Sequence, residues 1–166
     1  MANNYSLYPL ADPAGLVNQT TYDDAGRTTQ TVASVSGSTG DDLNQTVNYT
    51  YTLDNQVATL EAINGRTGNQ TTTYTYGTTL SDSGVASNLL LRYTDYPDSV
   101  SGSDRVTLAY NRLGQVTTRT DQRGTIRSFN YDKLGRATDD RVTTNGTGTD
   151  VTVKRISSTY EVRGML

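Results

Sequence analysis

Acidic side chains are the main candidates for chemistry in this chain, because the sequence contains no histidine and no cysteine. Adjacent carboxylates occur at Asp23-Asp24, Asp41-Asp42 and Asp139-Asp140. Two carboxylates that flank a sugar can hydrolyse a glycosidic bond when they lie roughly 5–9 Å apart. Neighbouring residues in a strand point to opposite faces, so a single pair cannot supply that geometry. We interpret these aspartates as solvated charges at turns and strand edges.

The missing residue types exclude several other kinds of site. Without His and Cys there is no Ser-His-Asp or Cys-His nucleophile system, and no zinc, haem or iron–sulfur centre built on those ligands. Calcium needs six to eight oxygen ligands, and the Asn/Gly/Asp loop at 145–150 has no ligand spacing of a known kind. We therefore expect no catalytic residue, no metal and no cofactor, and we expect that the chain is not an enzyme.

The charge balance and the apolar runs restrict the partners. The chain carries 14 Lys and Arg against 17 Asp and Glu, a net charge of -3 at pH 7. This balance argues against nucleic acid, because phosphate needs a basic surface. The longest aliphatic run is Leu89-Leu90-Leu91, which predicts no membrane-spanning helix. The first 30 residues contain no apolar segment typical of a signal peptide, so these residues leave the localisation unknown.

The composition predicts an all-β protein. Hydrophobic residues make up only 33% of the 166 residues, whereas the chain has 30 Thr and 12 Tyr, which favour strands. The 15 Gly are typical of tight turns. Short strands joined by turns are the elements that must position any functional side chain.

An internal repeat organises the chain. Residues 12–27 and 121–136 align without a gap and share Asp-x-x-Gly, then six residues, then Tyr-Asp-x-x-Gly-Arg. A looser Tyr-x-x-x-Gly frame occurs at Tyr22 and Gly26, Tyr110 and Gly114, Tyr131 and Gly135, and Tyr160 and Gly164, and a fifth copy at Tyr51 has Asn55 in place of the glycine. Two of the copies add the Asp and Arg of the full signature, at Asp23 and Arg27 and at Asp132 and Arg136.

The repeat predicts a hairpin turn at each copy. Tyr22 would end one strand and Arg27 would begin the next, and the Asp23 carboxylate would accept a local backbone N–H. Gly26 would adopt a positive φ after a type I turn, as in a hairpin closed by a glycine bulge. Asn55 fits this interpretation, because Asn tolerates the left-handed region best after Gly. We expect Arg27 and Arg136 to pair with a carboxylate or to cover the sheet with their stems.

Alternating residues predict the strands between the turns. Val47, Tyr49, Tyr51 and Leu53 share one face, as do Val106, Leu108 and Tyr110, and residues 85–93 also alternate. We predict an array of antiparallel β-hairpins that forms one open, curved sheet over residues 1–166. Its units lie near 12–35, 44–65, 71–98, 104–124, 125–145 and 151–166.

These residues resemble the RHS-repeat, or YD-repeat, family. Its signature Tyr-Asp-x-x-Gly-Arg stands complete at 22–27 and 131–136, in part at 110–115, and more distantly at 51–56 and 160–165. The resemblance implies a secreted or cell-surface protein whose repeats form a β-shell, for toxin encapsulation or for cell contact. This chain would then be a fragment of a larger repeat protein. Its partners would be neighbouring repeats, an enclosed C-terminal cargo or a surface glycan.

Two features leave alternatives open. Asp12-Pro13-Ala14-Gly15-Leu16 resembles a family motif near an autoproteolysis site, but further repeats follow it, and we interpret it as an ordinary turn. The tyrosines could fill the core of a chain that is poor in Leu and Ile, which we favour, or form an exposed ladder. We therefore expect a non-enzymatic structural scaffold. The alternative is a carbohydrate- or protein-binding adhesion module that uses a Tyr/Thr-rich sheet face.

Overall fold

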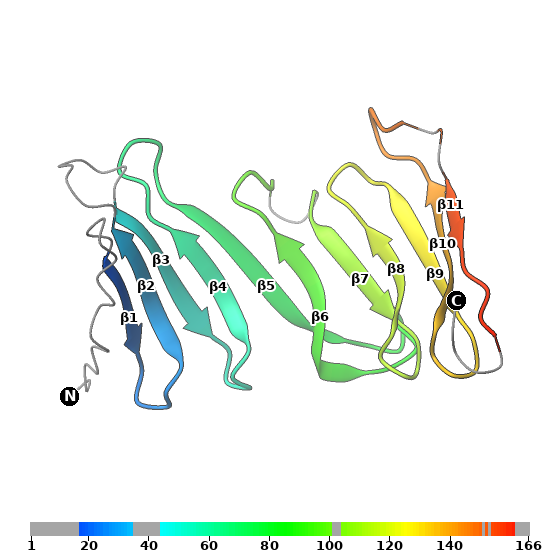
Figure 1. The fold of residues 1–166 in the computed structure, drawn as a ribbon, viewed down its shortest axis with the longest axis horizontal. Helices are drawn as coiled ribbons and strands as arrows, with labels where there is room; N and C mark the ends of the chain where they lie inside the picture. Colours follow the sequence, from blue (N-terminus) through cyan, green and yellow to red (C-terminus); the bar gives the residue numbers. More distant parts are fainter. Residues whose placement is uncertain (1–16, 35–43, 101–103, 151, 153, 162–166) are drawn as a thin grey trace. The chain divides into compact units, whose positions relative to one another are not determined.

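The computed structural model describes residues 17–34, 44–100, 104–150, 152 and 154–161 of the chain (Figure 1). All regular elements among these residues are strands, which confirms the all-β prediction. The strands are β1 (Val17–Tyr22), β2 (Thr28–Ser34), β3 (Asn44–Tyr51), β4 (Val57–Ala62), β5 (Gln70–Thr78), β6 (Ser87–Asp95), β7 (Val106–Tyr110), β8 (Val116–Thr120), β9 (Ile126–Tyr131), β10 (Ala137–Thr144) and β11 (Arg155–Ser157).

Each strand is hydrogen-bonded to the strands that precede and follow it in the sequence. The pairs are antiparallel, as short connections require, and the linear strand order leaves the sheet open. Contacts divide the chain into two compact units, residues 1–73 and 74–166, with the boundary inside β5. The curvature of the sheet stays a prediction.

The faces of the first unit differ in polarity, as period-2 alternation predicts. On one face Tyr49 is paired with Leu60 and Val47 with Ala62. On the other face polar side chains bond in a line across three strands. Gln30 donates to Asn48 at 2.9 Å, and Asn48 donates to Glu61 at 3.2 Å.

One predicted member of the apolar face was wrong. Leu53 does not continue the row of Val47, Tyr49 and Tyr51, because β3 ends at Tyr51 and the chain turns there. Its side chain is 104% exposed at the tip of the hairpin. The alternation simply continued past the last residue of the strand.

The described residues bury very little apolar surface. Val106 and Tyr110, each 7% exposed, are their only buried hydrophobic residues. Tyr110 thus fills a core position as predicted, whereas Tyr51, Tyr131 and Tyr160 are only half-buried. A chain with so few buried aliphatic side chains needs other contacts to hold one hairpin against the next.

The remaining sequence expectations for these segments can be placed directly. Residues 87–95 form strand β6, in agreement with the alternation read over 85–93. The described residues contain no helix long and apolar enough to cross a membrane.

Candidate functional site

The turn at Asp23 is built by its own carboxylate. Asp23 Oδ1 accepts hydrogen bonds from the backbone N–H of Ala25 at 3.0 Å and of Arg27 at 2.9 Å. The Gly26 N–H donates to the Asp23 carbonyl at 2.9 Å, and Gly26 has a φ of 78°. The Asp23 N–H donates to the Arg27 carbonyl at 2.9 Å, so Gly26 and Arg27 together lie opposite Asp23. This arrangement is the glycine-bulge hairpin that the spacing predicts.

The same turn recurs at the other described copies. The predicted left-handed position has a φ of 62° at Asn55, 75° at Gly114 and 81° at Gly135. In each copy its N–H donates to the carbonyl three residues earlier, at 3.0–3.1 Å. In the copy at Tyr160, Gly164 lies outside the described residues.

A further turn of this kind joins β8 to β9 and has no tyrosine before it. Asp121 Oδ1 accepts from the backbone N–H of Arg123 at 2.9 Å and of Thr125 at 2.8 Å, and Gly124 has a φ of 80°. The Asp-x-x-Gly frame of the repeat was the signal for it. The carboxylate and the glycine are therefore sufficient for the turn, and the tyrosine and the arginine of the signature have another task.

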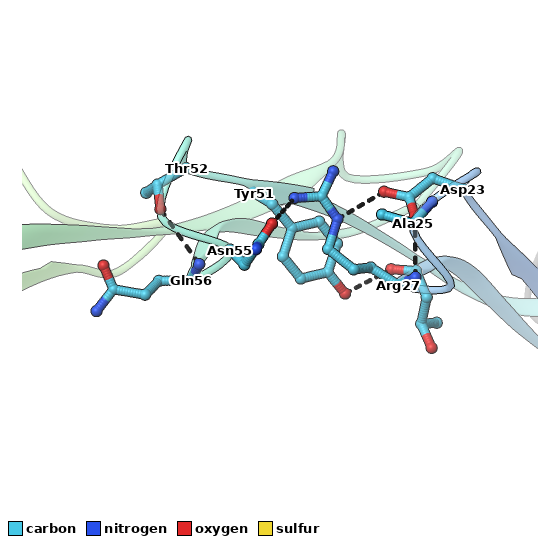
Figure 2. A network of polar contacts seen from close by, with 8 residues as sticks. Asp23, Ala25, Arg27, Tyr51, Thr52, Asn55 and Gln56 are labelled. Carbon is cyan, nitrogen blue, oxygen red and sulfur yellow. Dashed lines mark hydrogen bonds and ion pairs between the residues drawn. The ribbon is translucent and has the colours of Figure 1, made fainter.

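That task is to join one hairpin to the next (Figure 2). The Arg27 guanidinium lies over the Tyr51 ring, 4.6 Å from its centroid, and donates from Nη1 to Asn55 Oδ1 at 2.6 Å. Its Nε donates to Asp23 Oδ2 at 2.7 Å. The Tyr51 hydroxyl returns a hydrogen bond of 2.7 Å to the Thr28 carbonyl. We call this pair of contacts the hairpin clamp: the residue after a turn glycine reaches the following Tyr-x-x-x-Gly turn, and the tyrosine of that turn bonds the carbonyl of the next residue.

The second unit holds two more hairpin clamps. Arg136 lies 4.4 Å from the centroid of the Tyr160 ring, and the Tyr160 hydroxyl donates to the Ala137 carbonyl at 2.8 Å. Gln115 replaces arginine in the other clamp and donates through its amide to the Gly135 carbonyl at 2.8 Å. In that clamp the Tyr131 hydroxyl donates to the Val116 carbonyl, also at 2.8 Å.

The electrostatics of the clamps keep the aspartates charged and the Tyr131 hydroxyl protonated. The backbone N–H of Arg27, and then its guanidinium, hold the pKa of Asp23 below its ordinary value. The backbone N–H of Arg136 is the main cause of the same effect at Asp132. Desolvation raises the pKa of Tyr131, so its hydroxyl stays protonated and donates. None of these shifts provides a general base that is ready to accept a proton near neutral pH.

A related stack occurs in the second unit, away from the signature. Arg92 and Arg105 lie over the Tyr93 ring, at 4.6 and 4.5 Å from its centroid. Arg92 pairs with Asp82 at 2.9 Å and Arg105 pairs with Asp95 at 3.0 Å. Arginines held by a carboxylate and laid over an aromatic ring are thus a repeated packing element of this sheet.

The two carboxylates of the Asp139-Asp140 pair bind different arginines. Asp139 and Asp140 point to different partners, Arg155 for Asp139 at 2.6 Å and Arg127 for Asp140. The interpretation of Asp139 as a solvated charge was wrong. It is 7% exposed, and the hydrogen bond from Arg155 holds its pKa below the ordinary value.

Other candidate sites can be placed only in part. The described ranges contain no group of three or more acidic residues that could hold a metal ion, and the 145–150 loop is among them. Asp41-Asp42 and the Asp12-Pro13-Ala14-Gly15 turn lie outside the described residues. Comparison of the chain with known protein families and with curated proteins found no match.

Proposed function

We propose that this chain is a non-enzymatic structural scaffold in which hairpins join side by side into a wall. The hairpin clamps carry the proposal. Three times, the residue after one turn glycine holds the next repeat turn, and the tyrosine of that turn bonds back. The charged side chains of the repeat therefore make structural contacts. The Asp23 carboxylate bonds the backbone of its own turn, and the Arg27 guanidinium bonds the next turn.

The energetics of small sheets support this function. A two-stranded hairpin is marginally stable in water, and its apolar face must be covered by neighbouring units. An arginine over an aromatic ring contributes about 0.5–1 kcal/mol where it is exposed. A tyrosine hydrogen bond adds about 1 kcal/mol. Contacts of this size, repeated along a sheet, replace the aliphatic core that the composition does not provide.

We extend the proposal to the type of shell that RHS or YD repeats form, in a large secreted or cell-surface protein. Neighbouring repeats are then the main partners. The wall then encloses a C-terminal segment, such as a toxin, or makes contact with a second cell.

The alternative adhesion function would use exposed tyrosines to stack on sugars. The arginine stacks weigh against it, because a guanidinium already lies over the rings of Tyr51, Tyr93 and Tyr160. A sugar would have to compete with these arginines for the same aromatic surface.

Two measurements on the full chain test the scaffold. Sedimentation velocity over a wide concentration range should show association through sheet edges, since unpaired strand edges pair with other copies. Binding of neutral oligosaccharides, followed by isothermal titration calorimetry, should be absent. A chain that stays monomeric at every concentration and binds a neutral oligosaccharide would be an adhesion module.

A further inference from the structure

A row of basic side chains crosses the sheet of the second unit. Arg119 on β8 is directly paired with Arg127 on β9, and Arg127 is paired with Val142 on β10. Lys154, the residue directly before β11, continues the row, because the Val142 N–H donates to the Lys154 carbonyl at 2.7 Å. Like charges that lie directly opposite each other destabilise a sheet. The row therefore needs a negative charge near it.

The carboxylates of the protein supply only part of that charge. Arg127 donates to Asp140 through Nε at 3.0 Å, which neutralises the middle of the row. Partial desolvation raises the pKa of Asp121, but two backbone N–H groups and the nearby Arg119 charge bring it below its ordinary value. The side chains of Arg119 and Lys154 make no hydrogen bond or ion pair with another described residue.

The row lines an open pocket of about 310 Å³. Arg155 adds a fourth basic side chain to the lining, and its Nε donates to Asp139 at 2.6 Å. Val142 and Ile156 provide apolar surface beside the charges. A pocket of this volume is at the lower end of the range for small-molecule sites.

We propose that this pocket binds the oxyanion of a small ligand, a carboxylate or a phosphoryl group, through Arg119 and Lys154. Guanidinium groups suit such anions, because their N–H donors can bond two oxygens at once. The uncharged part of the ligand packs against Val142 and Ile156. This function is separate from the scaffold, since none of these residues belongs to a hairpin clamp.

Isothermal titration calorimetry of the full chain with three sugars tests the pocket. Glucuronate and glucose 6-phosphate carry the two anions on a similar ring, and glucose is the uncharged control. We expect dissociation constants on the order of 1 mM or lower for an anionic sugar, weakened by added salt, and no binding of glucose. Tighter binding of glucuronate identifies a carboxylate ligand, whereas tighter binding of glucose 6-phosphate identifies a phosphoryl ligand.

Substitutions locate the binding. Arg119→Gln and Lys154→Gln should each weaken the anionic sugar by about tenfold, as the loss of one charged contact does. Lys133→Gln removes the same charge from an exposed turn of the same unit and should leave binding unchanged. Absence of anion binding, or binding that survives both pocket substitutions, would overturn the proposal.

Discussion

The hairpin clamp between Arg27 and Tyr51 makes a quantitative prediction about stability. Arg27→Ala removes the cation over the ring at 4.6 Å and the hydrogen bond to Asn55 at 2.6 Å. These two losses should lower the free energy of unfolding by about 1–2 kcal/mol. The ion pair with Asp23 adds little to this cost, because solvent reaches both side chains.

A double-mutant cycle isolates the stacking on the ring. Tyr51→Leu removes the ring, whereas Tyr51→Phe keeps it and removes only the hydroxyl that bonds the Thr28 carbonyl. Arg27→Ala should therefore couple to Tyr51→Leu by about 0.5–1 kcal/mol. It should be additive with Tyr51→Phe within about 0.3–0.5 kcal/mol.

Urea unfolding followed by circular dichroism gives the four stabilities for each cycle. Hydrogen exchange at the amides of β3 and β4 shows that the change lies in the first unit. Arg112→Ala is the matched control, because this exposed arginine of another repeat turn makes no hydrogen bond or ion pair with the described residues. If Arg27→Ala couples equally to Tyr51→Leu and to Tyr51→Phe, the stacking is refuted, because only Tyr51→Leu removes the ring.

Three further predictions concern other turns. The pKa of Asp132 is lowered mainly by the Arg136 N–H, so its contribution to stability is complete above the unfolded value near 3.8 and is lost as the pH falls through the folded value. Asp132→Asn should therefore flatten the loss of stability below about pH 4 in acid titrations. Gly146→Ala places a Cβ 2.5 Å from the Arg123 carbonyl oxygen, and urea unfolding should show a loss of about 1–3 kcal/mol. The double change Asn111→Asp with Gln115→Arg completes the signature and sets a guanidinium over the Tyr131 ring, which should raise the unfolding free energy by about 0.5–1 kcal/mol. Gln115→Arg alone should gain less, because it loses the Asn111 amide bond at 2.8 Å without gaining an ion pair.

The sequence contained most of the information about the turns. The choice of Asp, then Gly or Asn three residues later, depends on local geometry, and local geometry can be read from a short segment. The structure agrees at Asp23, Gly26 and Asn55, including the bulge that the left-handed residue forms with the residue after it. The prediction that Arg27 pairs with a carboxylate or covers the sheet did not name its partner, which is Asp23 of the same turn.

The contacts between hairpins were missed, because they join residues that are distant in the sequence. Arg27 precedes Tyr51 by 24 residues, and Arg136 precedes Tyr160 by the same interval. That shared spacing was the available signal, and it was not used. The tyrosines were assigned mainly to a core, but in two of the three hairpin clamps the arginine of the preceding repeat covers a half-buried ring. The burial of Asp139 depends on Arg155 across the sheet, which no local pattern reveals.

Two positions where the sequence differs from the repeat signature, Gln115 and Asn55, indicate what the repeat does. Where Gln115 replaces arginine, its amide still reaches the next turn, at the Gly135 carbonyl. Where Asn55 replaces glycine, it keeps the left-handed φ of 62° and its side chain accepts the Arg27 hydrogen bond. A catalytic site depends on the reactivity of one residue type, and Gln for Arg would end it. A contact between hairpins needs only a donor of sufficient reach, and both departures keep it, so we infer that the repeat serves the joining of hairpins.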